Sequence, residues 1–330
     1  MPLRDAHNRT IADLRISITD RCNFRCFYCL PNGEPALARK ETLLTFEEIF
    51  RISEIFVSLG IKKLRLTGGE PMLRRDVPKL VEQLSALKPD LSDLALTTNG
   101  FDLPRRAAEL RAAGLDRVTI SLDSLDERNF ADITGVDALD KVLQAIEAAK
   151  EHGFSPVKVN TVVVRGRNEH EVVDFARFAR EHEVDFRFIE FMPLDSGHEW
   201  RRESVVSGRE IRSAINAVFP LVPENESRGS ETAWRYKFAD GAKGSIGIIA
   251  PVTEMFCGAC SRIRLTADGQ IRTCLFSTTE HNLRDVLRSG ARREEIVEFI
   301  RAVVDQKEAR HHINDLEFTQ PARTMSFIGG

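Results

Sequence analysis

Short apolar runs alternate with amphipathic helical patterns over the first two thirds of the chain. The runs are rich in Val, Ile and Leu, as buried parallel strands are, and they cover residues 14–19, 63–69, 94–100, 117–124, 157–164 and 186–193. Helical patterns fall between them at residues 45–57, 77–87, 104–113 and 138–152. Thr45 and Glu48 have the spacing of a capping box, which opens the first of these helices. The β–α units predict an α/β fold, a partial (β/α)6 TIM-like barrel, because parallel crossovers return on one hand.

The pattern changes after about residue 194. We predict a polar loop at residues 194–206, a helix opened by a capping box at 207–219 and a linker at 222–232. Two strands at 234–238 and 245–249 follow, then a hairpin at 262–276 and a last long helix at 291–310. The hairpin turns at Asp268-Gly269, a strong turn signal. The chain is therefore expected to form two domains: a barrel over residues 1–222, and a smaller C-terminal α+β domain over residues 223–330 that closes the barrel mouth.

Composition excludes several classes of protein. The chain has 330 residues, 42% of them hydrophobic and 29% charged, which is ordinary for a soluble globular protein. A formal net charge of -3 gives no indication of a nucleic-acid or membrane partner. The N-terminal residues lack the apolar core of a signal peptide, and no apolar run approaches the roughly 20 residues that span a bilayer. A cytoplasmic location is the expectation.

Polar and glycine-rich residues follow the predicted strands, as in Thr67-Gly68-Gly69-Glu70 and Thr97-Thr98-Asn99-Gly100. In a β/α barrel, the carboxyl ends of the strands carry the active site. Turns also favour Gly, Asn and Asp for purely structural reasons. That alternative holds for any single turn and weakens when five or six turns share the pattern.

Cys22, Cys26 and Cys29 form a C-x3-C-x2-C motif directly after the first predicted strand. A four-iron cluster usually takes four cysteines, so three thiolates leave one iron without a protein ligand and open to chemistry. Zinc is the alternative, but zinc sites usually pair C-x2-C units and would need a fourth ligand nearby.

Cys257, Cys260 and Cys274 form a second triplet, and the predicted hairpin brings Cys274 back towards Cys260. Disulfides are not expected in a reducing cytosol. Three thiolates again leave one ligand position open, where a cluster iron can bind a nitrogen or oxygen of a substrate. A structural zinc or an electron-relay cluster remains the alternative interpretation.

Arg262 and Arg264 follow the second triplet on a predicted strand, where alternate residues share one face. Two neighbouring guanidinium groups repel each other unless an anion lies between them, and arginine matches phosphate oxygens well. A solvated edge strand is the other interpretation. Arg15, Arg65 and Lys158 also alternate with apolar residues on predicted strands, and buried cations of this kind need an anionic partner.

The first triplet, with Tyr28 before its last cysteine, and the segment Gly68-Gly69-Glu70-Pro71 resemble the radical S-adenosylmethionine (SAM) superfamily. Nearly the whole chain resembles the GTP 3′,8-cyclases of molybdenum cofactor biosynthesis. The segments that carry this closer resemblance include LRISITDRCNFRCFYCLP, LRLTGGEP, SLDSLD, RFIEFMP, FCGACSRIRLTADGQIRTCLF and the C-terminal Gly-Gly.

The resemblance implies a role for each matching residue. It implies two 4Fe–4S clusters, bound by Cys22, Cys26 and Cys29 and by Cys257, Cys260 and Cys274. It implies SAM contacts by Tyr28, Gly69, Ser121 and Met192. It implies GTP contacts by Arg15, Arg65, Thr97, Lys158, Arg262 and Arg264. It also places the tail, Gly329 and Gly330, in the active-site cavity with a catalytic role.

The activity that the resemblance implies is the first step of molybdopterin synthesis. An external one-electron donor reduces the first cluster, and reductive cleavage of SAM gives a 5′-deoxyadenosyl radical. The radical takes the 3′ hydrogen of GTP, and the new carbon radical attacks carbon 8 of guanine to give 3′,8-cyclo-7,8-dihydro-GTP. The sequence is compatible with a homodimer. His311-His312 is expected to be a solvated helix end.

Two other functions remain open at this point. A radical SAM enzyme that modifies peptides would typically carry more C-terminal cysteines than the three found here. A non-enzymatic cluster or zinc scaffold would leave the segment Gly68–Pro71 unexplained.

Overall fold

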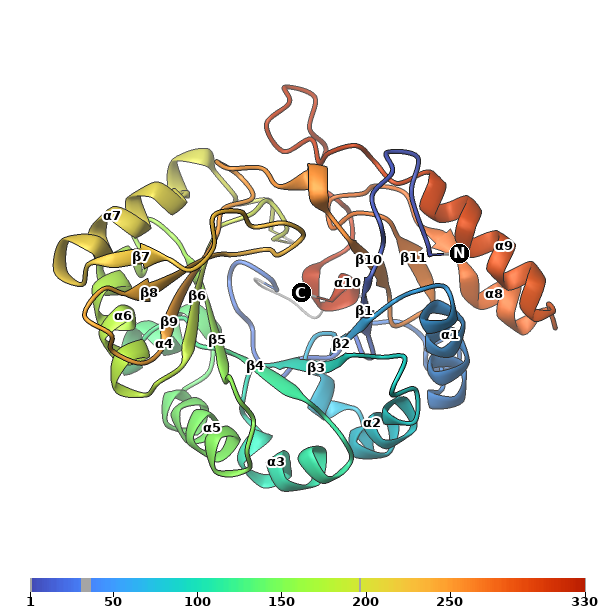
Figure 1. Ribbon diagram of the computed structural model, residues 1–330, viewed down its shortest axis with the longest axis horizontal. Coiled ribbons are helices and arrows are strands. Elements are labelled where there is room, and N and C mark those ends of the chain that lie inside the picture. Colours follow the sequence, from blue (N-terminus) through green and yellow to red (C-terminus); the bar gives the residue numbers. More distant parts are fainter. Residues whose placement is uncertain (1, 31–36, 196, 330) are drawn as a thin grey trace.

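The computed structural model describes residues 2–30, 37–195 and 197–329. Its centre is a curved parallel sheet whose first six strands are adjacent in chain order (Figure 1). These strands are β1 (Asp13–Ser17), β2 (Lys63–Thr67), β3 (Asp93–Thr98), β4 (Arg117–Ser121), β5 (Lys158–Val163) and β6 (Asp185–Glu190). Each overlaps one of the six predicted runs, so the predicted partial barrel is confirmed.

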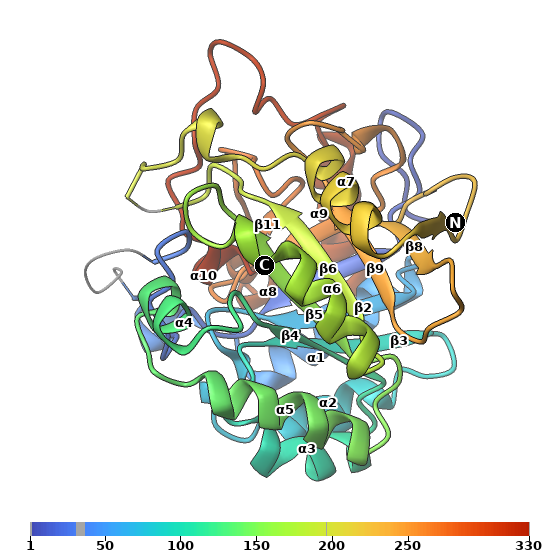
Figure 2. The same ribbon diagram turned by 90° about the vertical axis from the view of Figure 1, so that its left-hand side faces the viewer.

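Helices surround the outer face of the sheet (Figure 1). They are α1 (Phe46–Ser58), α2 (Val77–Ser85), α3 (Leu103–Ala112), α4 (Glu127–Thr134), α5 (Leu139–Glu151), α6 (Val172–Glu181) and α7 (Gly208–Val218). The capping box at Thr45 is present, with the Glu48 amide donating to its hydroxyl at 3.2 Å and the Thr45 amide donating back to the Glu48 carboxylate at 2.8 Å. Figure 2 shows α6 and α7 over the sheet, where both contact β6 and the later strand β9 (Ser245–Ile249).

Among α1 to α7, two helices fall outside the predicted ranges. Helix α4 has only eight residues, so it offers a short periodic signal. Helix α6 follows directly on a 3-10 turn at Glu169–Glu171, and its N-cap residue Glu171 makes no side-chain capping hydrogen bond.

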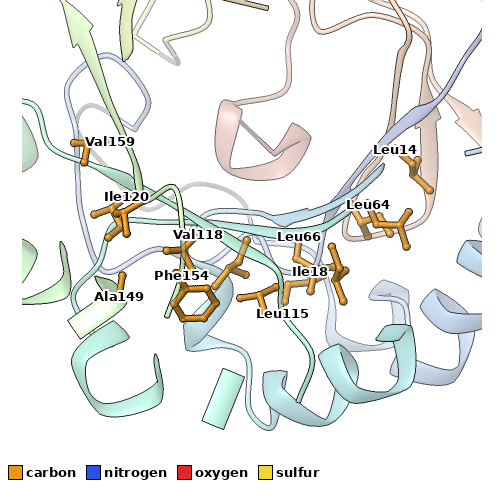
Figure 3. Close-up of a cluster of buried hydrophobic side chains, with 14 of the residues drawn as sticks. Leu14, Ile18, Leu64, Leu66, Leu115, Val118, Ile120, Ala149, Phe154 and Val159 are labelled. Atoms are coloured by element: carbon orange, nitrogen blue, oxygen red, sulfur yellow. The ribbon is translucent and has the colours of Figure 1, made fainter. Parts of the chain in front are cut away.

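The main core lies between the sheet and the helices. Figure 3 shows Leu14, Leu64, Val118 and Val159 on the helix side of their strands, and all four side chains are fully buried. Alternate strand residues point to opposite faces, so Arg15, the neighbour of Leu14, faces the barrel interior. The strands thus bury their apolar side chains against the surrounding helices and direct polar side chains into an internal cavity.

The C-terminal third adds strands to both edges of this sheet. Strand β9 pairs in parallel with β6, and β10 (Arg262–Leu265) pairs in parallel with β1. The remaining elements are β7 (Leu221–Pro223), β8 (Trp234–Phe238), β11 (Gln270–Arg272), β12 (His281–Asn282), α8 (Leu283–Arg288), α9 (Arg293–Asp305) and α10 (Met325–Ile328). The predicted hairpin is confirmed, because β10 and β11 are antiparallel.

Helix α10 lies inside the ring of strands and contacts β1 (Figure 1). The α+β character of the C-terminal region is therefore as expected, and the predicted domain boundary at residue 222 lies within β7. In the part of the chain that the structure describes, no helix is long and apolar enough to cross a membrane.

Candidate active site

All six cysteines line one cavity of about 360 Å³ inside the barrel. Cys22, Cys26 and Cys29 lie on the loop after β1, whereas Cys257 and Cys260 lie just before β10. The β10–β11 hairpin returns Cys274 to the same cavity, as the sequence predicts. The two triplets, which are more than 200 residues apart in the chain, therefore face a shared space.

The first triplet is a compact loop of buried thiols. The Cys29 amide donates to the Cys26 carbonyl at 2.9 Å, and the Phe24 amide donates to the Cys22 sulfur at 3.4 Å. Burial raises the pKa of Cys22 to about 11, that of Cys29 to about 12, and that of Cys26 well above its ordinary value. Buried thiolates at this position need a nearby positive charge, which cluster iron supplies.

The donor set fits an iron–sulfur cluster with one open iron. Within the described ranges, no three His, Cys, Asp or Glu side chains converge as ligands of a single metal ion would. A cubane cluster does not require its ligands to converge on one point, because each cysteine binds a separate iron atom.

Gly68 and Gly69 let the loop after β2 pack directly on the cluster loop. A Cβ atom at Gly68 would lie 2.4 Å from the Thr19 carbonyl oxygen, and one at Gly69 would lie 2.3 Å from that of Arg21. The Glu70 amide donates to the same Arg21 carbonyl at 2.7 Å. Glycine is required here because two backbones touch, and Gly69 also lines the cavity.

The other residues expected near SAM also lie on the cavity wall. Tyr28, Ser121 and Met192 all line it. The Tyr28 hydroxyl donates to the buried carboxylate of Asp123 at 2.5 Å, and Asp123 also accepts from the Val162 amide at 2.9 Å. Asp123 thereby ties the cluster loop to β5, a role that the sequence did not reveal.

The second triplet lies among basic groups. Burial acts to raise the pKa of Cys260, but the charges of Arg262 and Lys307 outweigh it and leave that pKa below its ordinary value. Burial raises the pKa of Cys274. Lys307 is buried and donates to the carbonyl of Thr273, beside Cys274. A cluster with thiolate ligands would find compensating positive charge here.

His311 is not the solvated residue that the sequence predicted. Its side chain is 6% exposed, lines the cavity and packs against Phe276 with 5.2 Å between ring centroids. The His311 amide donates to the Cys257 sulfur at 3.5 Å. The prediction was wrong for His311 because the chain after α9 folds back over the second triplet, which local polarity cannot indicate, whereas His312 is exposed as expected.

Arginines form a row across three parallel strands. Arg15 on β1 is in register with Arg264 on β10 and with Arg65 on β2. The Arg65 guanidinium donates to the hydroxyls of Thr97 at 3.2 Å and Thr119 at 3.1 Å. All three arginines line the cavity, together with Thr97, so the structure brings the predicted anion site together.

Charge in the cavity is strongly unbalanced. Counting described residues only, nine Lys and Arg side chains and three carboxylates line the wall. Burial and the neighbouring Arg15 lower the pKa of Arg65 to about 9, and burial with Arg187 lowers that of Lys158 to about 7. The Nε atoms of Arg15, Arg65 and Arg187 are buried and make no hydrogen bond to described residues. A multivalent anion in the cavity would stabilise such a cluster.

Arg187 was missed at the sequence level. It lies on β6, lines the cavity and is 3.3 Å from the Asp185 carboxylate, which is also 3.5 Å from the Lys158 ammonium. Its alternation with Phe186 and Phe188 is the pattern that identified Arg15 and Arg65, so the signal was available. The segment predicted as a linker also reaches the wall, where Glu231 pairs with Lys63 at 3.0 Å.

The C-terminal tail meets the arginine row. Arg264 donates to the Gly329 carbonyl, and Met325 of α10 lines the cavity. Arg262 extends outward from the row, with one nitrogen donating to the Ser230 carbonyl at 3.1 Å. Gly330 lies outside the described residues.

Comparisons with known proteins agree with this geometry. Residues 16–179 match the Radical SAM superfamily, and residues 184–313 match the family described as Molybdenum Cofactor Synthesis C. A curated "GTP 3',8-cyclase" from Streptomyces coelicolor is 47% identical over 99% of this chain and 96% of its own length. The protein of the same name from Rhodopirellula baltica is 45% identical over 99% of this chain and 92% of its own length.

Solved structures share the fold at low sequence identity. Streptococcus suis SuiB bound to its precursor peptide SuiA aligns with a TM-score of 0.63 and 18% identity, covering 90% of this chain and 68% of SuiB. Native anSMEcpe with bound AdoMet aligns with a TM-score of 0.59 and 16% identity, covering 93% of this chain and 84% of that protein. Two cysteine triplets on one cation-lined cavity, together with relatives that match along the whole chain, show that this chain belongs to the GTP 3′,8-cyclase family of radical SAM enzymes.

Proposed function

We propose that this protein is a GTP 3′,8-cyclase that converts GTP to 3′,8-cyclo-7,8-dihydro-GTP, the first step of molybdenum cofactor biosynthesis. One observation carries the proposal: a single cavity is lined by both cysteine triplets and by an excess of cations. A nucleoside triphosphate supplies the anion that these cations need. Its ribose and base then lie in the same enclosed space as the cluster-binding loop.

Within that space, the proposed phosphate site is the arginine row with its neighbours. Arg15, Arg65 and Arg264 present forked donors along adjacent strands, and Lys158 and Arg187 continue the basic surface on β5 and β6. Arginine forks suit phosphate oxygens better than single ammonium groups do. Thr97 already orients Arg65 by accepting from it at 3.2 Å.

The first triplet is the proposed site of the SAM-binding 4Fe–4S cluster. When bound, the cluster and SAM together supply a 5′-deoxyadenosyl radical that removes the 3′ hydrogen of GTP. Tyr28, fixed by Asp123 at 2.5 Å, and the bare backbone at Gly69 would hold SAM in place. The enclosed cavity keeps water and other reactants from the carbon radical.

We assign the second triplet to a second 4Fe–4S cluster that holds the purine. The three thiols line the same cavity as the arginine row, and the nearby Lys307 and Arg262 favour thiolate at Cys260. An open iron there would bind a nitrogen or oxygen of guanine. This assignment sets the base against the second triplet, with the triphosphate on the neighbouring arginines of β1 and β10.

The reaction needs an external one-electron donor, which we expect to be a cytoplasmic redox protein. Oxygen-sensitive clusters and six free cysteines suit a reducing compartment. A homodimer is compatible with the proposal, and no step above depends on it.

The decisive experiment uses GTP carrying deuterium at ribose carbon 3′. Reduced, reconstituted protein is incubated with SAM and this substrate, and 5′-deoxyadenosine is analysed by mass spectrometry. We expect deuterium in 5′-deoxyadenosine and a cyclised nucleotide product. ATP labelled at the same position is the matched control and should give neither. Formation of 5′-deoxyadenosine that carries no deuterium, beside a cyclised product, would refute the proposed reaction.

A further inference from the structure

Arg9, close to the N-terminus, contacts the backbone around the second cysteine triplet. Its Nε donates to the Asp5 carboxylate at 2.6 Å. One terminal nitrogen donates to the carbonyls of Cys257 at 2.9 Å and Ala309 at 2.8 Å, and the other donates to the carbonyl of Glu308 at 2.6 Å. Arg9 is 7% exposed and Asp5 is 6% exposed, so these bonds are largely shielded from water.

Through these bonds Arg9 links the two separate segments that carry the cysteines. Cys257 belongs to the loop before β10, whereas Cys274 follows β11. Glu308, whose carbonyl Arg9 binds, accepts from the Thr273 hydroxyl at 2.7 Å through its carboxylate. Lys307 donates to the Thr273 carbonyl. The path from Asp5 through Arg9 and residues 307–309 therefore reaches both Cys257 and the residue next to Cys274.

The same bonds fix a wall of the cavity. Lys307 and His311 both line the cavity, and they flank the two carbonyls that Arg9 binds. The His311 amide donates to the Cys257 sulfur at 3.5 Å. A shift of residues 308 and 309 would therefore move a buried cation, an imidazole and a hydrogen bond to a cysteine sulfur together.

From this geometry we infer that Arg9 is a positioning residue for the second cluster, held in place by Asp5. It sets the spacing between the Cys257 loop and the Cys274 segment and so the shape of the substrate end of the cavity. The inference rests on the proposed second cluster. It assigns a role in that site to the N-terminal segment, which pairs with itself through the Arg4–Thr10 bridge.

Arginine suits this position because it has five N–H donors in a rigid fork. Four donors are used here, one on Asp5 and three on backbone carbonyls. Lysine offers one ammonium group on a flexible chain and cannot reproduce this spread of directions. A positive charge at position 9 is therefore not enough to fill this role. The role also requires the directed hydrogen bonds of arginine, which distinguishes it from simple electrostatic attraction to the thiolates.

The test compares Arg9→Gln, Arg9→Lys and Asp5→Asn with Arg4→Gln in the full chain. Arg4 is the matched control: an exposed arginine on the same segment, whose guanidinium donates to the Asn8 side chain at 2.7 Å. After anaerobic reconstitution, iron per chain, SAM cleavage and GTP cyclisation are measured. The second cluster is then followed alone by electron paramagnetic resonance and redox titration in a Cys26→Ser background.

We expect Arg9→Gln to lose about half of the ~8 irons that two cubanes hold, to retain SAM cleavage, and to lose GTP cyclisation at least about tenfold. Arg9→Lys should keep more iron, with an altered resonance signal or midpoint potential for the second cluster. Asp5→Asn should fall between Arg9→Lys and wild type. Arg4→Gln should match wild type in every measurement.

Two results would overturn the inference. One is an Arg9→Gln or Arg9→Lys protein with the iron content, signal, potential and cyclisation of wild type. The other is equal loss of both clusters with loss of SAM cleavage, which would make Arg9 a general fold residue. Failure of the proposed second cluster is recognised separately, because the wild-type chain would then bind only about four irons.

Discussion

The Arg264 guanidinium donates a hydrogen bond to the carbonyl of Gly329, which joins the C-terminal tail to the row of cavity arginines. Gly329 has a φ of 78°, and a Cβ there would lie 2.5 Å from Thr67 Cγ2 and 3.2 Å from Ser17 Cβ. The tail is thus pressed against the ends of β1 and β2, where only glycine fits. Arg264 is consequently shared between the proposed phosphate site and the tail.

Gly329→Ala should displace the tail and reduce GTP cyclisation about tenfold or more, while both clusters and SAM binding persist. Gly241→Ala is the control, because Gly241 has a nearly identical φ of 79° with no atom within 4 Å of an added Cβ. The two variants share the cost of a left-handed alanine, on the order of 1 kcal/mol, and differ only in the clash. Cyclisation is measured by product formation per chain. Equal activity in both variants would show that the position of the tail does not matter.

Arg262→Ala and Arg264→Ala should have different kinetic effects. Each removes a charge-assisted contact worth about 1.5–3 kcal/mol, which corresponds to roughly 10- to 150-fold in GTP affinity. Arg262→Ala should weaken GTP binding with little change in kcat, whereas Arg264→Ala should also lower kcat because it frees Gly329. Equilibrium binding and steady-state kinetics separate the two effects. Identical profiles for both variants would argue against a coupling through the tail.

Arg187→Gln should raise the KM for GTP about tenfold or more, since it removes a cation that lines the cavity. It should also leave iron content unchanged, because the ion pair that Arg187 makes is with Asp185 on its own strand, β6. Arg177→Gln provides the comparison, as Arg177 is a surface residue of α6 paired with Asp174. If Arg187→Gln changes the KM for GTP no more than Arg177→Gln does, Arg187 does not belong to the phosphate site.

GTP binding should weaken as the pH rises through 7. Burial and Arg187 lower the pKa of Lys158 to about 7, so the free protein loses this ammonium above that pH. A bound triphosphate favours the charged form, and binding near or above pH 7 should therefore take up a proton at Lys158. Calorimetry in buffers of different ionisation enthalpy measures this uptake.

The terminal phosphate of GTP also titrates in this range, so Lys158→Gln is the required reference for that experiment. The difference in proton uptake between wild type and Lys158→Gln isolates the lysine. No difference across pH 6–9 would contradict the assignment of Lys158 to the anion site.

Cys26→Ser and Cys260→Ser should separate the two clusters. Cys26→Ser should lose about half of the ~8 irons and all SAM cleavage, because the first cluster is gone. Cys260→Ser should lose a similar amount of iron, keep uncoupled SAM cleavage and form no cyclised product. Continued 5′-deoxyadenosine formation by Cys26→Ser would overturn the central claim, and normal cyclisation by Cys260→Ser would make the second site structural.

The sequence predicted the fold well wherever the signals were local. Apolar runs located β1 to β6, and the capping boxes at Thr45 and Ser207 located the starts of α1 and α7. Motif spacing grouped the cysteines within each triplet, because loop and hairpin geometry are local too, whereas the pairing of β10 with β1 brings the two triplets to one cavity. Alternation on strands identified Arg15 and Arg65 and, applied consistently, would have identified Arg187.

Features that depend on distant chain segments could not be predicted. His311 is buried only because residues after α9 return to Cys257, and Arg9 reaches the same loop from the opposite end of the chain. Asp123 likewise acquires its partner, Tyr28, through packing of the cluster loop on β4 and β5. None of these contacts has a periodicity or a spacing that a single sequence reveals.

The pairing of β10 with β1, and of β9 with β6, has a consequence for how the protein is made. Until the ribosome has delivered β9, the nascent chain carries two unpaired parallel edges, each with a row of open backbone donors and acceptors, and the edge at β1 stays open until β10 follows. Such long-range pairing is slow, and exposed edges invite aggregation in the meantime. The N-terminal barrel strands should therefore depend on chaperones during synthesis and become protease-resistant only after the chain is nearly complete.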